Sequence, residues 1–163
     1  MKQAFRLIFE KLRFCYLVTI GAFKLLFYPD SYLHRVGFFY SVGQHKPLNL
    51  KREPVPWMNY NAISFLETRL SKSIKIFEYG SGYSTVFYAD RASQVTSLEY
   101  NKEWLNKIQE MLSGRDNVRL LYKPLEYDGE YCKAILSTRE KFDLVIVDGR
   151  DRVRCIFNAV DAL

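Results

Sequence analysis

A short apolar stretch that ends in an acid and runs into a glycine-rich turn constrains the fold of this chain most. Residues 74–85 read Ile-Lys-Ile-Phe-Glu-Tyr-Gly-Ser-Gly-Tyr-Ser-Thr, with Glu78 closing the apolar run and Gly80-x-Gly82 following it. The polar pair Ser84-Thr85 then leads into an apolar helical stretch. This order predicts a strand, a tight turn and a helix N-terminus, in which the backbone approaches a nucleotide-like ligand closely.

Two further acids follow apolar runs in the same way. Glu99 ends the run that begins at Val95, and Asp148 ends the run 142–147. An acid about 20 residues beyond such a glycine turn can accept hydrogen bonds from both hydroxyls of a ribose, so Glu78 and Glu99 together predict a site for an adenosine-containing cofactor. Three acids on one rim would disfavour the pyrophosphate of a dinucleotide and tolerate a sulfonium cofactor without phosphate.

Apolar runs of strand length alternate with helical patterns beyond residue 73. We predict strands at 74–79, 95–99, 118–122 and 142–147, and helices at 61–70, 84–91, 102–112, 130–137 and from residue 153 onward. Strands separated by helices imply right-handed crossovers, a parallel sheet and an α/β fold. The last apolar run has the composition of a strand that is buried on both faces.

Residues 1–60 form a basic, aromatic-rich helical segment and connector ahead of an α/β domain at 61–163. The formal net charge is +6, and the whole excess lies in residues 1–60. The longest uncharged run covers only residues 14–23, whereas a spanning helix needs about 20 apolar residues, so we expect no spanning helix. Two interpretations of residues 1–28 stay open, a helix lying at a membrane surface and a helix covering the sheet or a partner.

Trp57, Met58, Asn59 and Tyr60 stand just before the first predicted strand. In nucleotide-binding α/β domains such a segment often lies over the ligand cleft, so these residues are candidates for a lid. The alternative is a packing anchor for the helix at 61–70.

Several other chemistries are disfavoured by residue counts and spacing. Cys15, Cys132 and Cys155 are odd in number and far apart, which fits a reducing compartment better than a disulfide framework or a zinc site. His34 and His45 lie far in sequence from the glycine turn, so a His-based metal centre or a Ser-His-Asp triad is hard to assemble. No basic stripe interleaves with the predicted ligand loops. We therefore expect a cytoplasmic protein with no metal and no nucleic-acid partner.

These motifs resemble the class I S-adenosylmethionine-dependent methyltransferases. The resemblance rests on Glu78-x-Gly80-x-Gly82-x-Ser84, on Glu99, and on Phe142-Asp-Leu-Val-Ile-Val-Asp148-Gly-Arg150, and it covers residues 74–157. It implies a Rossmann-like parallel sheet with flanking helices, S-adenosylmethionine as the cofactor, and methyl transfer to an unidentified small-molecule or glycan-type acceptor.

The resemblance also assigns roles to single residues. The implied cofactor-binding set is Glu78, Tyr79, Gly80, Ser81, Gly82, Ser84, Glu99, Leu125, Glu126 and Asp148. Within it, Glu78 and Gly80 would hold the methionine end, Glu99 the ribose, and Leu125-Glu126 would flank the adenine. Ser84 stands where many members carry a third glycine, and its hydroxyl can cap the helix.

The acceptor side of the implied site has fewer candidates. Asp148 would face the methionine amino group or the acceptor and is the one candidate general base. Arg150, Trp57 and Tyr60 are candidates for acceptor contacts.

The sheet of this family normally has seven strands, whereas the fourth predicted strand here is followed by one helix up to Leu163. We therefore expect either an incomplete, truncated domain or an oligomer or partner that covers the open edge. Two alternatives remain. One is a non-catalytic, truncated methyltransferase-like interaction module. The other is an NAD(P)-dependent oxidoreductase, against which the turn lacks the third glycine of the dinucleotide fingerprint.

Overall fold

The computed structural model describes residues 2–163, with side chains from residue 6 onward. The chain divides into two compact units, residues 1–53 and 54–163. The sequence predicted this boundary after residue 60, seven residues later than it is found. Residue 60 is already the first residue of a helix of the second unit.

The first unit is helical. It contains α1 (Lys2–Phe27), α2 (Tyr32–Arg35) and α3 (Phe38–Gln44). The last carbonyls of α1, which have no partner within the helix, are satisfied from the next segment. The Ser31 hydroxyl donates to the Leu25 carbonyl at 2.7 Å, and His34 Nε2 lies 2.9 Å from the Leu26 carbonyl. These two bonds fix the turn at Pro29 that ends α1.

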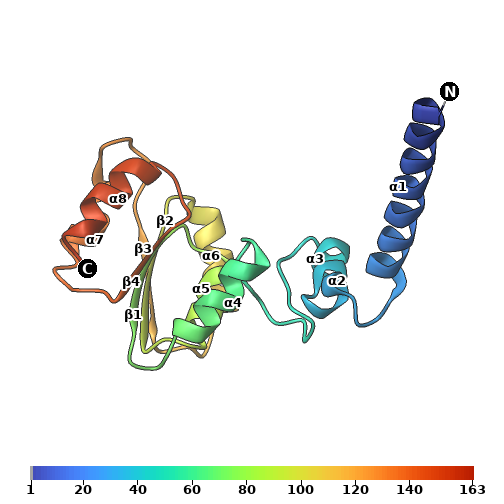
Figure 1. The fold of residues 1–163 in the computed structure, drawn as a ribbon. Helices are drawn as coiled ribbons and strands as arrows, with labels where there is room; N and C mark the ends of the chain where they lie inside the picture. Colours follow the sequence, from blue (N-terminus) through green and yellow to red (C-terminus); the bar gives the residue numbers. More distant parts are fainter. Residues whose placement is uncertain (1) are drawn as a thin grey trace. The chain divides into compact units, whose positions relative to one another are not determined.

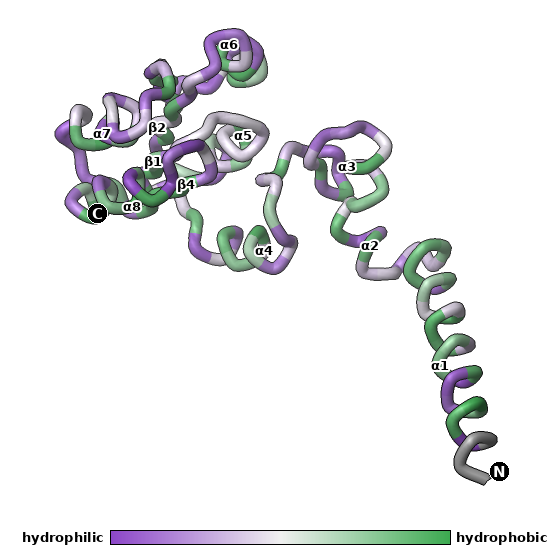
Figure 2. The backbone as a smooth tube through the Cα atoms, turned by 90° about the horizontal axis from the view of Figure 1, so that it is seen from above, coloured by the Kyte–Doolittle hydropathy of each residue, from purple (hydrophilic) through white to green (hydrophobic). Residues whose placement is uncertain are grey.

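Helix α1 is longer and more continuously apolar than the sequence argument allowed. The segment Arg6–Arg35 is long and apolar enough, by length and composition, to cross a membrane, and none of it is buried; a signal sequence near an N-terminus passes the same test. In Figure 2 the tube of α1 is mostly green, with purple bands at its charged residues. The sequence argument counted only the uncharged run 14–23, whereas the helix continues through the few charged residues on either side of that run.

The second unit is an α/β domain, as predicted. Its elements are α4 (Tyr60–Arg69), β1 (Lys75–Tyr79), α5 (Tyr83–Ala89), β2 (Gln94–Glu99), α6 (Lys102–Met111), β3 (Val118–Tyr122), α7 (Glu130–Ser137), β4 (Leu144–Val147) and α8 (Arg152–Val160). The four strands form a parallel sheet in the order β3-β2-β1-β4 (Figure 1). Strand β1 is central, and Ile76 pairs with Val95 on one side and Leu144 on the other.

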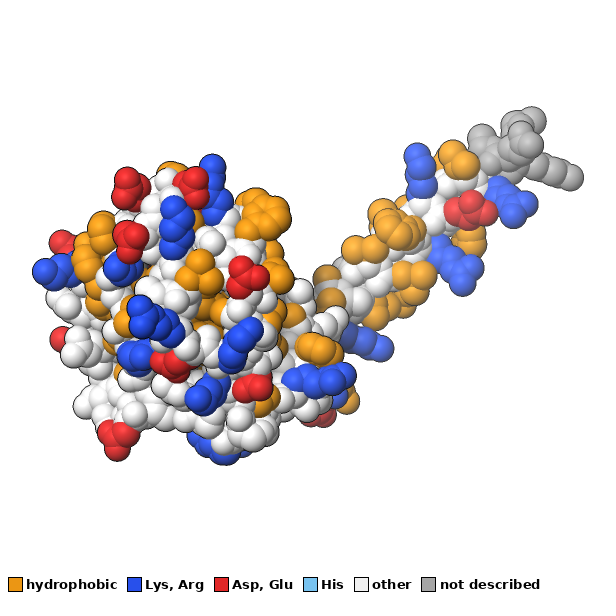
Figure 3. All heavy atoms as spheres, turned by 90° about the vertical axis from the view of Figure 1, so that its left-hand side faces the viewer, with side chains coloured by type: hydrophobic (Ala, Val, Ile, Leu, Met, Phe, Trp, Pro, Cys, Tyr) orange, Lys and Arg blue, Asp and Glu red, His pale blue; other side chains and the backbone are white. Residues whose placement is uncertain are grey.

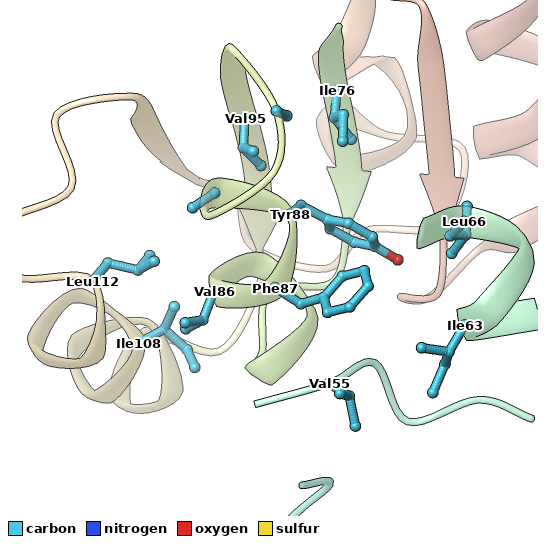
Figure 4. Packing of buried hydrophobic residues seen from close by; sticks show 12 residues of the cluster. Val55, Ile63, Leu66, Ile76, Val86, Phe87, Tyr88, Val95, Ile108 and Leu112 are labelled. Atoms are coloured by element: carbon cyan, nitrogen blue, oxygen red, sulfur yellow. The ribbon is translucent and has the colours of Figure 1, made fainter. Parts of the chain in front are cut away.

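Helices cover both faces of the sheet, with α4, α5 and α6 on one and α7 and α8 on the other (Figure 1). Successive side chains of a strand point to opposite faces. Ile76 accordingly belongs to the buried cluster on the α5 side, where Figure 4 shows it beside the ring of Tyr88. Phe77 belongs to the cluster on the α7–α8 side, with its ring centroid 5.3 Å from that of Phe142. The α/β fold follows from this alternation, because each strand supplies apolar side chains to both layers.

Strand β4 lies at one edge of the sheet, as the sequence order implied. All of its residues are half-buried, although its apolar composition is that of a central strand. The helix that follows it also carries apolar side chains on its outer surface, namely Val153, Ile156, Phe157 and Val160.

Candidate cofactor site at the carboxyl edge of the sheet

The carboxyl ends of β1, β2 and β4 meet at one edge, which brings Glu78, Glu99 and Asp148 together there. Backbone bonds tie the three strand ends to one another. The amide of Gly80 donates to the Leu98 carbonyl at 2.8 Å, and the amide of Asp148 donates to the Tyr79 carbonyl at 3.0 Å. The geometry of the turn is therefore set by the sheet itself.

The fold itself requires glycine at position 80. Its φ is +96°, in the left-handed region that favours glycine. A Cβ there would lie 2.8 Å from the Cα of Gly149, the residue that follows Asp148. The β1 and β4 loops thus touch through two glycines, and a side chain at Gly80 would separate them.

Gly82 is different, because nothing within the protein requires it to lack a side chain. Its φ is −175°, extended backbone that any residue adopts. A Cβ there would meet only the Ser84 hydroxyl, at 3.7 Å, which is ordinary van der Waals contact. The space beside Gly82 is open, so a ligand could reach the backbone at this point.

Glu78 is fully buried and accepts hydrogen bonds from three hydroxyls. Ser84 donates to Oε1 at 2.5 Å, while Thr85 and Ser97 donate to Oε2 at 2.6 and 2.7 Å. Ser84 therefore bonds the carboxylate, and the prediction that it caps the helix is wrong. The residue that binds the free amide at the start of α5 is Thr85, whose hydroxyl accepts from Gly82 N at 2.9 Å.

The surroundings of Glu78 push its pKa in opposing directions. Burial raises the pKa most, the three hydroxyl donors lower it, and the nearby charge of Asp148 raises it further; the result is a rise from 4.5 to about 7. Desolvation thus outweighs the hydrogen bonds. Near neutral pH this carboxyl is divided between its charged and neutral forms.

Glu99 is also buried, but its partners are backbone amides. Its Oε1 accepts from Tyr100 N at 2.9 Å and Asn101 N at 2.8 Å, and its Oε2 accepts from Ser81 N at 3.2 Å. A carboxylate offers about four acceptor positions, so one is left on Oε2. The amide of Ser81 thereby links the glycine turn to the end of β2.

Two residues that the sequence analysis did not identify as part of the site, Trp104 and Ser97, also form hydrogen bonds to the glycine turn. The indole N–H of Trp104 on α6 donates to the Ser81 carbonyl at 2.8 Å, and the Ser81 and Ser97 hydroxyls lie 2.7 Å apart. One signal for Ser97 was present in the sequence, since a polar residue inside the apolar run 95–98 generally finds a hydrogen-bond partner when buried. The neighbouring Thr96 does not follow this rule, because its buried hydroxyl has no such partner in the described part of the chain. For Trp104 we find no such signal.

Asp148 is exposed and forms an ion pair, 2.8 Å long, with Arg152 at the start of α8, four residues further along the chain. Arg150 is fully exposed, and its Nε lies 3.5 Å from the Tyr100 hydroxyl. That contact raises the pKa of the Arg150 guanidinium, so the group stays charged. Both side chains are therefore available to solvent at the carboxyl edge.

The remaining predicted residues are less closely tied to this edge. Leu125 is partly buried against the α7–α8 layer, and Glu126 is exposed with its side chain against Gly129. Trp57 is 73% exposed, whereas Tyr60 packs against the α4–α5 layer.

No group of three or more His, Cys, Asp or Glu side chains among residues 6–163 is arranged to hold a metal ion. An open hollow of about 1000 Å³ lies between α6 and β3 and is lined by Leu105, Leu112 and Val118 among others. None of the carboxyl-edge residues lines it, so the geometry of the turn, and not this hollow, defines the candidate site.

No family model matches the chain, and no curated protein matches it. Solved structures do. A methyltransferase-like protein from Silicibacter pomeroyi aligns with a TM-score of 0.56 and 23% identity over 68% of this chain and 69% of its own. An rRNA methylase from Streptococcus thermophilus aligns with a TM-score of 0.53 and 18% identity, over 66% of this chain and 68% of its own.

A methyltransferase candidate from Streptococcus mutans, solved in complex with SAH, aligns with a TM-score of 0.52 and 18% identity, over 66% of this chain and 68% of its own. At these identities the similarity concerns the fold. It confirms the fold that the sequence motifs implied: the chain has the Rossmann-like fold of the S-adenosylmethionine-dependent methyltransferases.

Proposed function

We propose that the carboxyl edge of residues 54–163 binds S-adenosylmethionine and that the protein serves methyl transfer. The observation that carries this proposal is the contrast between two glycines. Gly80 is required by the protein's own backbone, whereas Gly82 is not. A ligand in the open space beside Gly82 would explain why this position carries no side chain.

The donor set at this edge fits such a ligand. The acceptor position left on Oε2 of Glu99 suits one ribose hydroxyl, one fewer than the sequence motif alone suggested. Glu99, and Glu78 in its charged form, provide negative charge that suits a cation, whereas the charge of Asp148 is partly offset by its ion pair with Arg152. Gly82 and Ser81 would lie against the cofactor, with Glu78 behind them.

When bound, S-adenosylmethionine supplies a methyl carbon that is already activated. The contribution expected from the protein is therefore to orient the acceptor and to exclude water. Asp148 stays the one candidate general base, since its ion pair with Arg152 is made through Oδ1. Glu78 is enclosed by hydroxyls and is fully buried, so it holds the glycine turn in place and is not a general base.

The acceptor is proposed only as a class, a small molecule or a macromolecule. Arg150, Trp57 and Tyr60 remain candidates for acceptor contacts, and the exposed Arg150 guanidinium would suit an acidic group. The absence of a nucleic-acid partner stays a prediction, since one similar structure is that of a protein named as an rRNA methylase. A partner covering the edge strand β4 also stays a proposal.

The test is calorimetric titration of the purified chain with S-adenosylmethionine and S-adenosylhomocysteine. Gly82→Ala should fold normally and bind about 5- to 150-fold more weakly, because a methyl group forced against a ligand costs about 1–3 kcal/mol. Gly43→Ala is the matched control, since a Cβ at Gly43 meets nothing within 4 Å. The control should bind like the wild type.

Three other outcomes of the titration would each contradict a different part of the proposal. A folded wild-type chain that binds neither compound would leave a non-catalytic module. Binding that Gly82→Ala leaves unchanged would place the cofactor elsewhere on the protein. Tight binding of NADH would favour the oxidoreductase alternative.

A further inference from the structure

Helix α1 exposes an unusual amount of apolar surface. From Arg6 to Phe27 every side chain is exposed except Ile20 and Gly21, which are half-exposed. Its large exposed apolar residues are Leu7, Ile8, Phe9, Leu12, Phe14, Tyr16, Leu17, Val18, Phe23, Leu25, Leu26 and Phe27. Figure 3 shows these side chains in orange along the helix, with blue Lys and Arg between them. A contiguous patch of this kind marks a binding surface.

Four of the five charged side chains described in α1 lie on one side of the helix. Arg6, Glu10, Arg13 and Lys24 follow one another at spacings of four, three and eleven residues. These spacings are close to one, one and three turns of an α-helix, so the four side chains lie along one stripe. Lys11 departs from this pattern, because it lies three residues after Ile8 and four before Cys15, on the other side of the helix. Its long aliphatic stem would have to bend toward the headgroups for its ammonium group to reach them.

The opposite stripe is apolar. Ile8, Leu12 and Leu26 lie on it, together with Cys15 between them, and all of these are exposed. The helix therefore has a charged stripe and a wide apolar face, the form of helices that lie in a membrane interface. A narrow apolar seam, which a helix–helix contact would need, is not what the pattern gives.

The positive charge of α1 favours an anionic lipid surface as its binding partner. Arg6 is paired with Glu10 at 3.1 Å, while Lys11, Arg13 and Lys24 have no acidic partner among the described side chains. These three cations would repel a second parallel copy of the helix and attract anionic headgroups.

The spacing of the charges, and not the length of α1, argues for lying in the interface and against crossing the membrane. Between Arg13 and Lys24 the uncharged residues 14–23 extend about 15 Å as a helix. The hydrocarbon core is about 30 Å thick, so a spanning α1 would hold a charged side chain within it.

We propose that α1 attaches this chain to an anionic lipid surface by lying in the membrane interface, with the stripe of Arg6, Arg13 and Lys24 toward the headgroups and the face of Ile8, Leu12 and Leu26 toward the acyl chains. This inference is independent of the proposed cofactor site, which lies in the other unit of the chain.

The first test is co-sedimentation of the full chain with vesicles of phosphatidylcholine alone or mixed with phosphatidylglycerol. The chain should bind the mixed vesicles and be released by high salt. The variant Lys11→Gln/Arg13→Gln/Lys24→Gln should bind them on the order of 100-fold more weakly, from about 5-fold for each charge removed. Because these side chains are exposed, the variant should keep the wild-type circular dichroism spectrum.

A control variant removes the same charge elsewhere. Lys46, Lys51 and Lys107 are exposed, and replacing all three with Gln should leave vesicle binding unchanged. A second variant, Ile8→Asn/Leu12→Asn, should weaken binding through the apolar face. Equal loss in the charge control would mean that net charge, and not α1, governs binding, and would overturn the proposal.

The orientation of α1 can be read from the exposed thiol. Cys15 lies on the apolar face, whereas Cys132 and Cys155 are buried, so a fluorophore can be attached selectively. On mixed vesicles the label at Cys15 should be shielded from aqueous iodide. A label moved to the charged stripe, in Cys15→Ser/Leu17→Cys, should remain quenchable.

Equal shielding of both labels, with binding that survives high salt, would show a spanning helix and overturn the proposal. So would absence of vesicle binding together with concentration-dependent association, which would identify a second copy of the chain as the partner of α1.

Discussion

The buried carboxyl of Glu78 should make the stability of the protein fall as the pH rises, and Glu78→Gln should remove that dependence. Glutamine has nearly the same shape and keeps an oxygen for the bonds from Thr85 and Ser97. Its amide group would replace Oε1, where Ser84 now donates. The Ser84 hydroxyl can turn to accept from that amide, so all three contacts can persist.

The sign follows from the pKa, which is 4.5 ordinarily and about 7 in the folded protein. Because the folded state binds the proton more tightly, its advantage is fully present below pH 4.5 and is lost as the pH rises through 7. At 1.36 kcal/mol per pKa unit, Glu78 lowers the free energy of unfolding by roughly 2–3 kcal/mol between pH 5 and pH 8.

The assay is urea unfolding of the wild type and Glu78→Gln at pH 5 and pH 8, followed by tryptophan fluorescence. The wild type should lose roughly 2–3 kcal/mol more than the variant between the two pH values. Glu110→Gln, at an exposed position on α6, is the control and should behave like the wild type. A Glu78→Gln protein with the wild-type pH dependence would refute the reasoning.

Two more predictions concern packing and thiol access. Gly149→Ala should destabilise the protein by about 1–3 kcal/mol, because the new methyl group would collide with the Tyr131 hydroxyl. Adding Tyr131→Phe should restore part of the loss in thermal melts, and a double variant no more stable than Gly149→Ala would show that this collision is not the cause. In thiol titration with a disulfide reagent only Cys15 should react quickly, since Cys132 and Cys155 are buried and burial raises the pKa of the Cys155 thiol to about 12. A second fast thiol in the native protein would contradict that burial.

The order of strands and helices could be predicted from the sequence because each element carries its own periodicity. The strand at 118–122 and the helix at 130–137 have the predicted limits. The last strand begins two residues later than predicted for a tertiary reason. The Phe142 amide bonds the Ala162 carbonyl, so this residue is engaged outside the sheet. Asp143 still contacts β1, but its carboxylate, and not its carbonyl, accepts from Lys75 N, while its amide donates to the Lys75 carbonyl.

The partners of the site residues were less accessible to prediction. Acids at strand ends could be found from the sequence, but whether such an acid meets hydroxyls, as Glu78 does, or backbone amides, as Glu99 does, depends on which strands are neighbours. The role of Ser84 was misjudged for the same reason. A hydroxyl near a helix start can bond the helix or a residue on another element, and its own sequence does not decide between them.

The strand order in the sheet also predicts the sequence in which the strands of the α/β unit come together during folding. Glu78 on β1 and its partner Ser97 on β2 are separated by 19 positions, whereas Lys75 at the start of β1 and Asp143 beside β4 are separated by 68. Closing the longer loop costs more chain entropy and is repaid only when β4 and the α7–α8 layer are in place. We therefore expect β4 to join the sheet last and to exchange its amide hydrogens first, while β1 and β2 stay protected. The acid network around Glu78 would then survive partial opening of the domain, since all of its hydroxyl donors belong to the early-forming half.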